Sequence, residues 1–276
     1  MVMDTNSWAH EQWRRAAPDW TQRSQDRNYR GIVVRPSLNR LIGESRPIKD
    51  GYFVDIGCGD GSETNYIAEF LSRYESTGKF YGLDPQSLMI ESATPLDGSV
   101  STRFFVGDVQ DFVYGKVEGV PMMQNRADIV TSLFVLQDTP DVEDIVKSAA
   151  VCLNNRGKAV FVLVHPEFGE AMRLKGALDI KEGKSDPRFV YNAGYPIVEE
   201  DGRTFFVPYF HRDLDFYRNL FSKYFRSSRF ENLRPDRTDI DAAERDHISP
   251  FYKHDGNLYY PEIIEMPSSL LVVAAH

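Results

Sequence analysis

Short apolar runs alternate with segments of helical periodicity through the middle of the chain. The runs are typical of buried strands, and they cover residues 52–56, 79–83, 102–106, 128–134 and 159–164. Between them, three segments carry apolar residues spaced for one face of a helix, at 62–74, 86–93 and 141–153. Thr139 and Pro140 fit the N-cap and the first position of the last of these helices. This alternation predicts a parallel sheet with helices on both faces.

The alternation breaks at Pro166. Residues 166–210 have no clear place in the series, but two β-prone runs flank a polar turn at 199–202 and predict a β-hairpin. A helix with Leu214 on its apolar face follows, and two further strands are expected at 227–233 and 268–275. The domain organisation that we expect is an N-terminal helical cap segment at 1–46 and one α/β domain at 47–276. Within that domain, 166–210 is a substrate-covering insertion.

Composition narrows the class of protein. The chain has 276 residues, and its 42% hydrophobic and 26% charged residues are ordinary for a soluble globular protein. A formal net charge of −9 disfavours a nucleic-acid partner, which needs a basic surface. No run of about 18 apolar residues predicts a membrane span, and the first residues lack the apolar core of a secretory signal. Because Cys58 and Cys152 are the two cysteines and form no disulfide framework, we expect a cytoplasmic protein with reduced thiols. The sequence leaves the oligomeric state open between monomer and homodimer.

A glycine-rich turn follows the first strand, where the sequence reads VDIGCGDG at 54–61. Such a turn lets a ligand approach the backbone, and the amide groups at the start of the next helix favour an anionic group. A dinucleotide-binding turn would place a third glycine where this chain has Ser62. Asp55, at the end of the strand, instead suits a cationic amino group. A turn without any ligand is the alternative interpretation.

Two further aspartates end the next two strands. Asp84 is placed to accept hydrogen bonds from both hydroxyls of a ribose, and Asp108 to accept one from the amino group of an adenine. In an open α/β sheet, ligands bind at this carboxyl edge. Taken alone, either aspartate could also be an exposed loop residue that binds no ligand. Carboxylates at three successive strand ends favour a ligand, because a desolvated charge needs a partner.

These motifs together resemble the class I S-adenosylmethionine-dependent methyltransferases, of the small-molecule type related to the ubiquinone/menaquinone methyltransferases. The resemblance covers about residues 50–165. The motifs that carry it are VDIGCGDG (54–61), GLDPQSLMIESA (82–93), VGDVQDF (106–112), ADIVTSLFVLQDTPD (127–141) and LNNRGKAVFVL (153–163). The chain departs from the family at Asn154-Asn155-Arg156-Gly157, where Pro-Gly-Gly is frequent, and at Gln86, where Ser is common. The resemblance implies a Rossmann-like, seven-stranded, mostly parallel sheet with helices on both faces.

The resemblance also implies roles for individual residues. Asp55, Gly57 and Gly59 would contact the methionine end of the cofactor, Asp84 would hold the ribose, and Asp108 and the backbone of Val109 would contact the adenine. Cys58 and Pro85 would be further cofactor-binding residues. Ser132 and Leu133 would line the amino-acid end, and Phe134 the face where the methyl group is transferred.

Candidate acceptor contacts and bases are less sharply defined. Three residues are candidate bases: His165 after the fifth strand, His211 at the expected start of a helix, and Asp138 after the fourth strand. A hydrogen bond to a neighbouring loop for His165, and a helix cap for His211, are the alternatives. Gln137, Tyr195, Tyr209 and Phe210 are candidate substrate contacts, although the aromatic residues also suit ordinary core packing. The six histidines are scattered without metal-ligand spacing, so no metal is expected.

The function that we expect is transfer of a methyl group from S-adenosylmethionine to an oxygen or nitrogen of a small, aromatic or apolar metabolite or natural product. Methylation of a protein residue is the alternative within the same chemistry. A nucleotide-binding oxidoreductase and a non-catalytic cofactor-binding module are the alternatives from other classes.

Overall fold

The computed structural model describes residues 5–23, 30–43, 48–174, 179–180, 191–198, 204–234 and 266–276, and the structural statements that follow concern these residues. A seven-stranded sheet in the order β3-β2-β1-β4-β5-β10-β9 forms the centre of the fold. Its strands are β1 (Gly51–Ile56), β2 (Gly78–Asp84), β3 (Val100–Val106), β4 (Ala127–Leu133), β5 (Leu153–Val164), β9 (Ser227–Leu233) and β10 (Ser269–Ala275).

The sheet is mostly parallel, as the sequence predicts. Strands β1 to β5 pair in parallel, whereas β10 pairs antiparallel with both β5 and β9. Strand order reverses at β1, because β2 and β3 lie on one side of it and β4 and β5 on the other. A reversal of this kind opens a crevice at the carboxyl ends of the neighbouring strands, where ligands bind.

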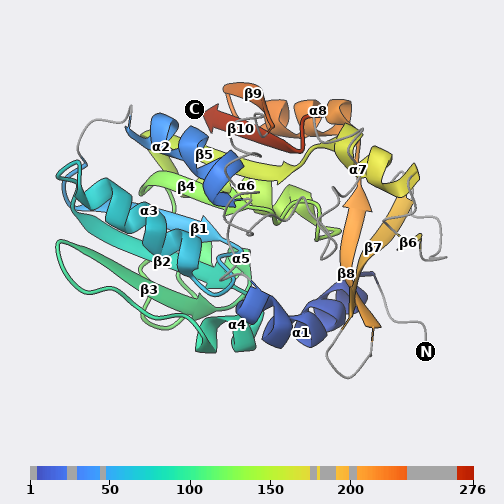
Figure 1. Cartoon of the computed structure of the whole chain (residues 1–276). Coiled ribbons are helices and arrows are strands. Elements are labelled where there is room, and N and C mark those ends of the chain that lie inside the picture. The colour runs from blue at the N-terminus through green and yellow to red at the C-terminus, as the bar shows by residue number, and fades with distance from the viewer. Residues whose placement is uncertain are drawn as a thin grey trace.

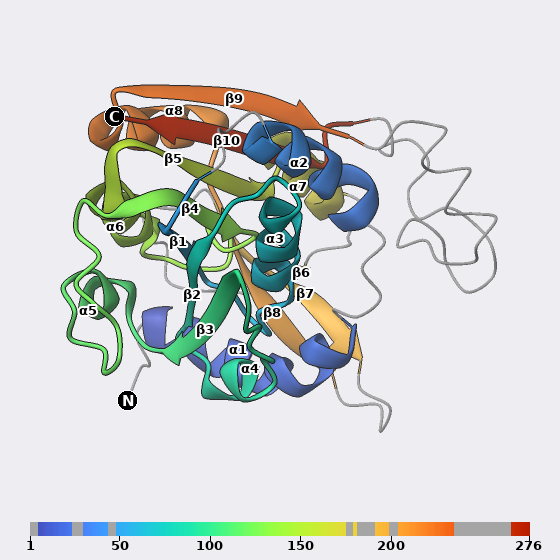
Figure 2. The ribbon, with the colours of Figure 1, turned by 90° about the vertical axis from the view of Figure 1, so that its left-hand side faces the viewer.

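Helices cover both faces of this sheet (Figures 1 and 2). Apolar residues of α5, α6 and α8 pack on one face, and those of η1, α2 and α3 pack on the other. The helices are α1 (Thr5–Arg23), η1 (Arg30–Val34), α2 (Arg35–Gly43), α3 (Ser62–Ser72), α4 (Ser87–Glu91), α5 (Val109–Val113), α6 (Val142–Cys152), α7 (Pro166–Leu174) and α8 (Leu214–Tyr224). The first three of these fall in the predicted N-terminal helical segment.

The segment 166–210 contains the predicted hairpin in a longer form. Strands β7 (Tyr191–Val198) and β8 (Thr204–His211) are antiparallel, and β6 (Asp179–Ile180) pairs with β7. Helix α1 packs against β8, where the rings of Trp8 and Phe210 meet edge to face with centroids 6.1 Å apart. In Figure 1, α1 and β8 lie beyond the carboxyl ends of β1 and β2.

Two local predictions were wrong by a few residues. Asp141 rather than Thr139 occupies the N-cap position of α6, and its side chain makes no cap hydrogen bond. The carbonyl groups of Thr139 and Pro140 accept hydrogen bonds from the Arg212 guanidinium. His211 is the last residue of β8, and Asp213 caps α8 by accepting a hydrogen bond from the Phe216 amide. His211 therefore does not open a helix.

Candidate cofactor-binding site

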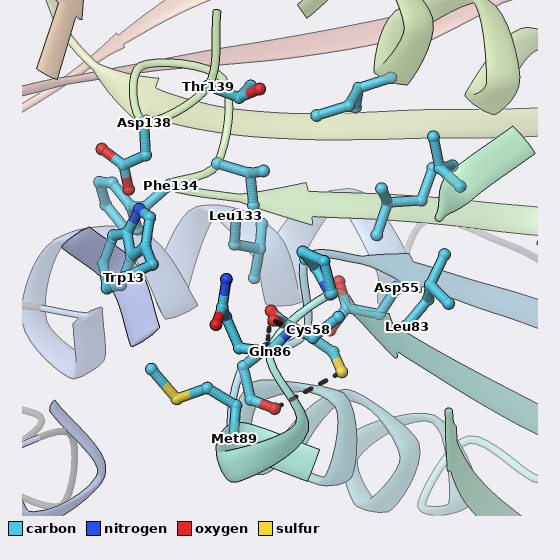
Figure 3. Close-up of a pocket in the computed structure, with 18 of the residues that line it drawn as sticks. Trp13, Asp55, Cys58, Leu83, Gln86, Met89, Leu133, Phe134, Asp138 and Thr139 are labelled. Carbon is cyan, nitrogen blue, oxygen red and sulfur yellow. Dashed lines mark hydrogen bonds between the residues drawn. The ribbon is translucent and has the colours of Figure 1, made fainter. Parts of the chain in front are cut away.

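A cavity of about 230 Å³ lies at the carboxyl ends of the central strands. The loops that follow β1, β2, β3 and β4 form most of its wall, and residues of α1 and η1 complete it. Eleven predicted site residues line it: Asp55, Gly57, Cys58, Gly59, Asp84, Pro85, Asp108, Val109, Leu133, Phe134 and Asp138. Figure 3 shows the labelled Trp13, Phe134 and Asp138 on one side of this cavity, with Cys58 and Met89 on the other.

The glycine-rich turn after β1 is held against β2. The amides of Gly57 and Cys58 both donate to the carbonyl oxygen of Leu83, at 2.7 and 3.0 Å. Gly57 has a φ of 74°, and a Cβ atom there would lie 2.3 Å from Cγ2 of Val135. Gly59 also has a positive φ, 55°, but a Cβ atom there would meet nothing within 4 Å. Gly57 is therefore needed for packing, whereas Gly59 leaves open space for a ligand.

Asp55 is buried between two threonine hydroxyl groups. Thr64 and Thr131 donate to its two carboxylate oxygens at 2.6 and 2.7 Å. Burial raises the pKa of Asp55, and the two hydroxyl groups oppose that effect. The Cys58 thiol beside it is buried, and that burial raises its pKa well above the usual range, so the thiol stays neutral.

Asp84 connects the first two turns of the crevice. One of its carboxylate oxygens accepts from the Gly59 amide at 3.0 Å, and the other accepts from the Gln86 amide at 2.9 Å. Burial raises the pKa of Asp84 to about 6, and the two amide hydrogen bonds lower it. The carboxylate can therefore gain or lose a proton near neutral pH.

Asp108 has a different environment, because its side chain is exposed. It caps α5 by accepting a hydrogen bond from the Gln110 amide at 2.7 Å. Val109 follows it along the cavity wall. The helix-cap role was not part of the sequence prediction, but it fixes the orientation of this carboxylate at the rim.

The loop after β4 brings Phe134 and Asp138 to the cavity. Phe134 has a φ of 59°, a left-handed conformation that is strained for a phenylalanine. Its amide donates to the Val162 carbonyl at 2.6 Å, and its carbonyl accepts from the Gln137 side chain at 2.7 Å. Burial raises the pKa of Asp138 well above its usual range, against the lowering effects of Gln137 and of the Arg30 charge.

Six predicted site residues do not line the cavity. Ser132 and Gln137 are buried behind the wall, and Gln137 instead bridges the Phe134 carbonyl and the Val164 amide. The others are His165, Tyr209, Phe210 and His211, all of which are buried. The side chain of Tyr195 lies outside the described residues.

The two histidines are each held by neighbouring groups. Nδ1 of His165 accepts from the Glu167 amide at 3.2 Å, and burial lowers the pKa of this imidazole. Nδ1 of His211 lies 3.5 Å from the hydroxyl group of Tyr209. His165 thus bonds to the first turn of α7 rather than to a neighbouring loop. Asp138 is the candidate base that faces the cavity.

The N-terminal segment supplies cavity residues that the sequence did not single out. These are Ala9, His10 and Trp13 of α1, and Arg30 of η1. The Arg30 guanidinium lies over the Phe134 ring at 5.7 Å and 3.9 Å from the Glu63 carboxylate. Arg35 donates to the same carboxylate at 2.9 and 3.2 Å. In the sequence, the signal that this polar segment packs on the domain is its three tryptophans, Trp8, Trp13 and Trp20.

Within the described part of the chain, no three His, Cys, Asp or Glu side chains come together in a way that could hold a metal ion. Nor is any described helix both long enough and apolar enough to cross a membrane. The metal-free reaction and the cytoplasmic location therefore stay predictions.

Comparison with known proteins identifies the domain. Residues 54–161 match a family described as a methyltransferase domain. The chain carries a class I methyltransferase domain. The cofactor of this class is S-adenosylmethionine, so the protein is an S-adenosylmethionine-dependent methyltransferase. The match spans the glycine-rich turn, the three strand-end aspartates and the loop after β4, and it removes the oxidoreductase alternative. No curated protein sequence matches the chain.

Solved structures share the fold of the methyltransferase domain and its flanking segments. A structure described as a DhpI–SAM–HEP complex is 15% identical and covers 100% of both chains, with a TM-score of 0.57. An S-adenosylmethionine-dependent methyltransferase from Mesorhizobium loti is 18% identical over 87% of this chain and 96% of its own, with a TM-score of 0.54. A chain in the complex of a methyltransferase with the Haloferax volcanii Trm112 activator is 17% identical over 95% and 97%, with a TM-score of 0.59.

Proposed function

We propose that the chain methylates an oxygen or nitrogen atom of a small, aromatic or apolar acceptor. The observation that carries this proposal is the cover on the cavity. Ala9, His10 and Trp13 of α1 and Arg30 of η1 lie over the crevice formed by the strand ends. A covered cavity of this size suits a small acceptor better than a folded protein chain.

We place the cofactor along the carboxyl edge from β4 to β3. Asp55 and the glycine-rich turn face its methionine end, Asp84 faces the ribose, and Asp108 and Val109 face the adenine. The open space at Gly59 and the carboxylate oxygens of Asp84 fit this placement. Arg30, near the methionine end, provides a positive charge for the carboxylate of the cofactor.

The acceptor is placed beside Trp13, Phe134 and Asp138. When bound, the cofactor supplies an electrophilic methyl group on a sulfonium centre. The chain's own residues hold the acceptor atom in line with that group and exclude water, which are the main protein contributions to such a displacement. Asp138 accepts the proton that an acceptor hydroxyl or amine loses, and then releases it to solvent.

Acceptor screening tests this proposal. The purified chain is incubated with S-adenosylmethionine and separate pools of phenols, aromatic acids, aromatic amines and unstructured peptides. We expect acceptor-dependent formation of S-adenosylhomocysteine, with one added methyl group on a small aromatic compound by mass spectrometry. Turnover confined to the peptide pool would support protein methylation and contradict the proposal.

Comparison of Gly59→Ala with Gly57→Ala should distinguish an effect on cofactor binding from an effect on stability. The added methyl group enters the open space at the turn, so we expect binding of S-adenosylhomocysteine to weaken about tenfold. The left-handed backbone adds about 1–2 kcal/mol of destabilisation. In Gly57→Ala the added methyl group instead collides with Val135, so we expect a larger drop in melting temperature. Calorimetric titration and thermal unfolding of both variants measure the two effects. Unchanged affinity in Gly59→Ala would contradict the placement of the cofactor.

Cofactor affinity should depend on pH through Asp84. Its pKa is raised to about 6, and the ionised form is the better acceptor for two ribose hydroxyl groups. Affinity for S-adenosylhomocysteine should therefore be constant above pH 7 and fall as pH drops through 6. Below the pKa of Asp84, this affinity should fall about tenfold for each pH unit. Titrations between pH 5 and 7.5 check this, and Asp84→Asn should remove most of the dependence. If the affinity of the wild-type protein did not change over this pH range, the prediction that Asp84 ionisation controls cofactor binding would be refuted.

Metal independence is expected because orientation and a carboxylate base are sufficient for this displacement. Once an acceptor is found, turnover should be the same within about twofold after treatment with EDTA. Activity that EDTA abolishes and Mg²⁺ restores would show that the prediction is wrong.

A further inference from the structure

The loop that follows β4 is held from behind by the side chain of Arg212, which is 3% exposed. Nη1 of this guanidinium donates to the carbonyl oxygens of Leu136 at 3.0 Å and Phe210 at 3.2 Å. Nη2 donates to the carbonyl oxygens of Thr139 at 2.7 Å and Pro140 at 3.0 Å. Three carbonyl groups of one loop therefore converge on a single buried side chain.

A second contact ties the same loop to β8. The amide of Phe210 donates to the Gln137 carbonyl at 2.7 Å. The carbonyl groups of residues 136, 137, 139 and 140 are thus all held by the end of β8 or by the residue just after it. The planar guanidinium can donate in several fixed directions at once, which a lysine ammonium on a flexible stem cannot reproduce.

The opposite side of this loop faces the cavity. Val135, Asp138 and Thr139 line it, and Asp138 lies between the carbonyl groups that Arg212 holds. Strand β8 also packs on α1 through Phe210 and Trp8, and α1 supplies Trp13 to the cavity. The loop and α1 are therefore joined through Phe210, and Arg212 adds further bonds to the loop.

We propose that Arg212 is a positioning residue for methyl transfer. It fixes the 134–141 loop so that Val135, Asp138 and Thr139 face the cofactor, and it makes the shape of that loop depend on the docking of β8. This inference rests on the proposed placement of the cofactor in the cavity. It adds a role for a residue that does not itself line the site.

Arg212→Lys and Arg212→Met test the role, with S-adenosylhomocysteine as the probe. We expect Arg212→Lys to weaken binding about tenfold in calorimetric titration, and Arg212→Met to weaken it further. Hydrogen exchange over 134–141 should be at least about tenfold faster in Arg212→Lys, while β4 and β5 keep their wild-type exchange. Leu220→Ala is the matched control, because it truncates a buried side chain on the following helix. It should lower the melting temperature and leave affinity within about twofold of wild type.

Two results would overturn the proposal. One is affinity and loop exchange in Arg212→Lys that match the wild type. The other is a loss of affinity in Leu220→Ala equal to that in Arg212→Lys at a matched drop in melting temperature, since general destabilisation would then explain both. If Arg212→Met does not fold, Arg212→Lys, which keeps the charge, decides the question. A wild-type chain that fails to bind S-adenosylhomocysteine would instead refute the proposed cofactor site.

Discussion

Asp84→Ala should weaken binding of S-adenosylhomocysteine about 10-fold to 150-fold. This range corresponds to about 1.5–3 kcal/mol, the usual loss when hydrogen bonds to a charged group are removed. In the cofactor placement that we propose, both ribose hydroxyl groups lose their acceptor in this variant. The amides of Gly59 and Gln86 also lose theirs, so the glycine-rich turn is less firmly held. Calorimetric titration at pH 7.5 measures the effect.

A surface carboxylate provides the control for this measurement. Asp97 is exposed and pairs with Arg103 at 2.7 Å, and it does not line the cavity. Asp97→Ala should therefore leave the affinity unchanged. Wild-type affinity in a folded Asp84→Ala variant would remove Asp84 from the cofactor site.

The meeting of Asp55, Asp84 and Asp108 at one cavity could be predicted because its signals are local in sequence. Each of the segments around Asp55, Asp84 and Asp108 is a short strand followed by a turn, and parallel strands bring their carboxyl ends to one edge. The shared edge follows from the βα alternation, whereas the order of the strands does not. No knowledge of side-chain packing was needed to bring these three residues together.

The acceptor side could not be predicted in the same way, because position at a strand end does not fix the direction of a side chain. His165 follows β5, but β5 pairs with the antiparallel β10, and the His165 amide donates to the Ser268 carbonyl. Its ring accepts a hydrogen bond from Glu167 and does not reach the cavity. Tyr209 and Phe210 pack inward because β8 supports α1 and the loop after β4.

Arg30 shows a second limit of the sequence. Its neighbours in the structure, Glu63 and Phe134, are far away along the chain, and no local pattern marks the contact. The same is true of Arg212, whose partners on the β4 loop lie 72 to 76 residues earlier. Long-range contacts of single charged side chains leave no periodic signal in the residues around them.

Asp138→Asn should lower kcat about 100-fold or more and leave affinity for the cofactor within a few fold, because it removes the base that faces the acceptor. Burial raises the pKa of Asp138 well above its usual range, so wild-type turnover should rise with pH as this carboxyl group ionises. The asparagine variant should lose that rise. His165→Gln is the matched comparison, since His165 is a candidate base whose side chain lies outside the cavity, and it should keep the wild-type pH profile. The measurement is kcat from pH 5 to 9 at saturating S-adenosylmethionine with the acceptor found by screening. If Asp138→Asn kept both the rate and the pH profile of the wild type, the acceptor would need positioning alone.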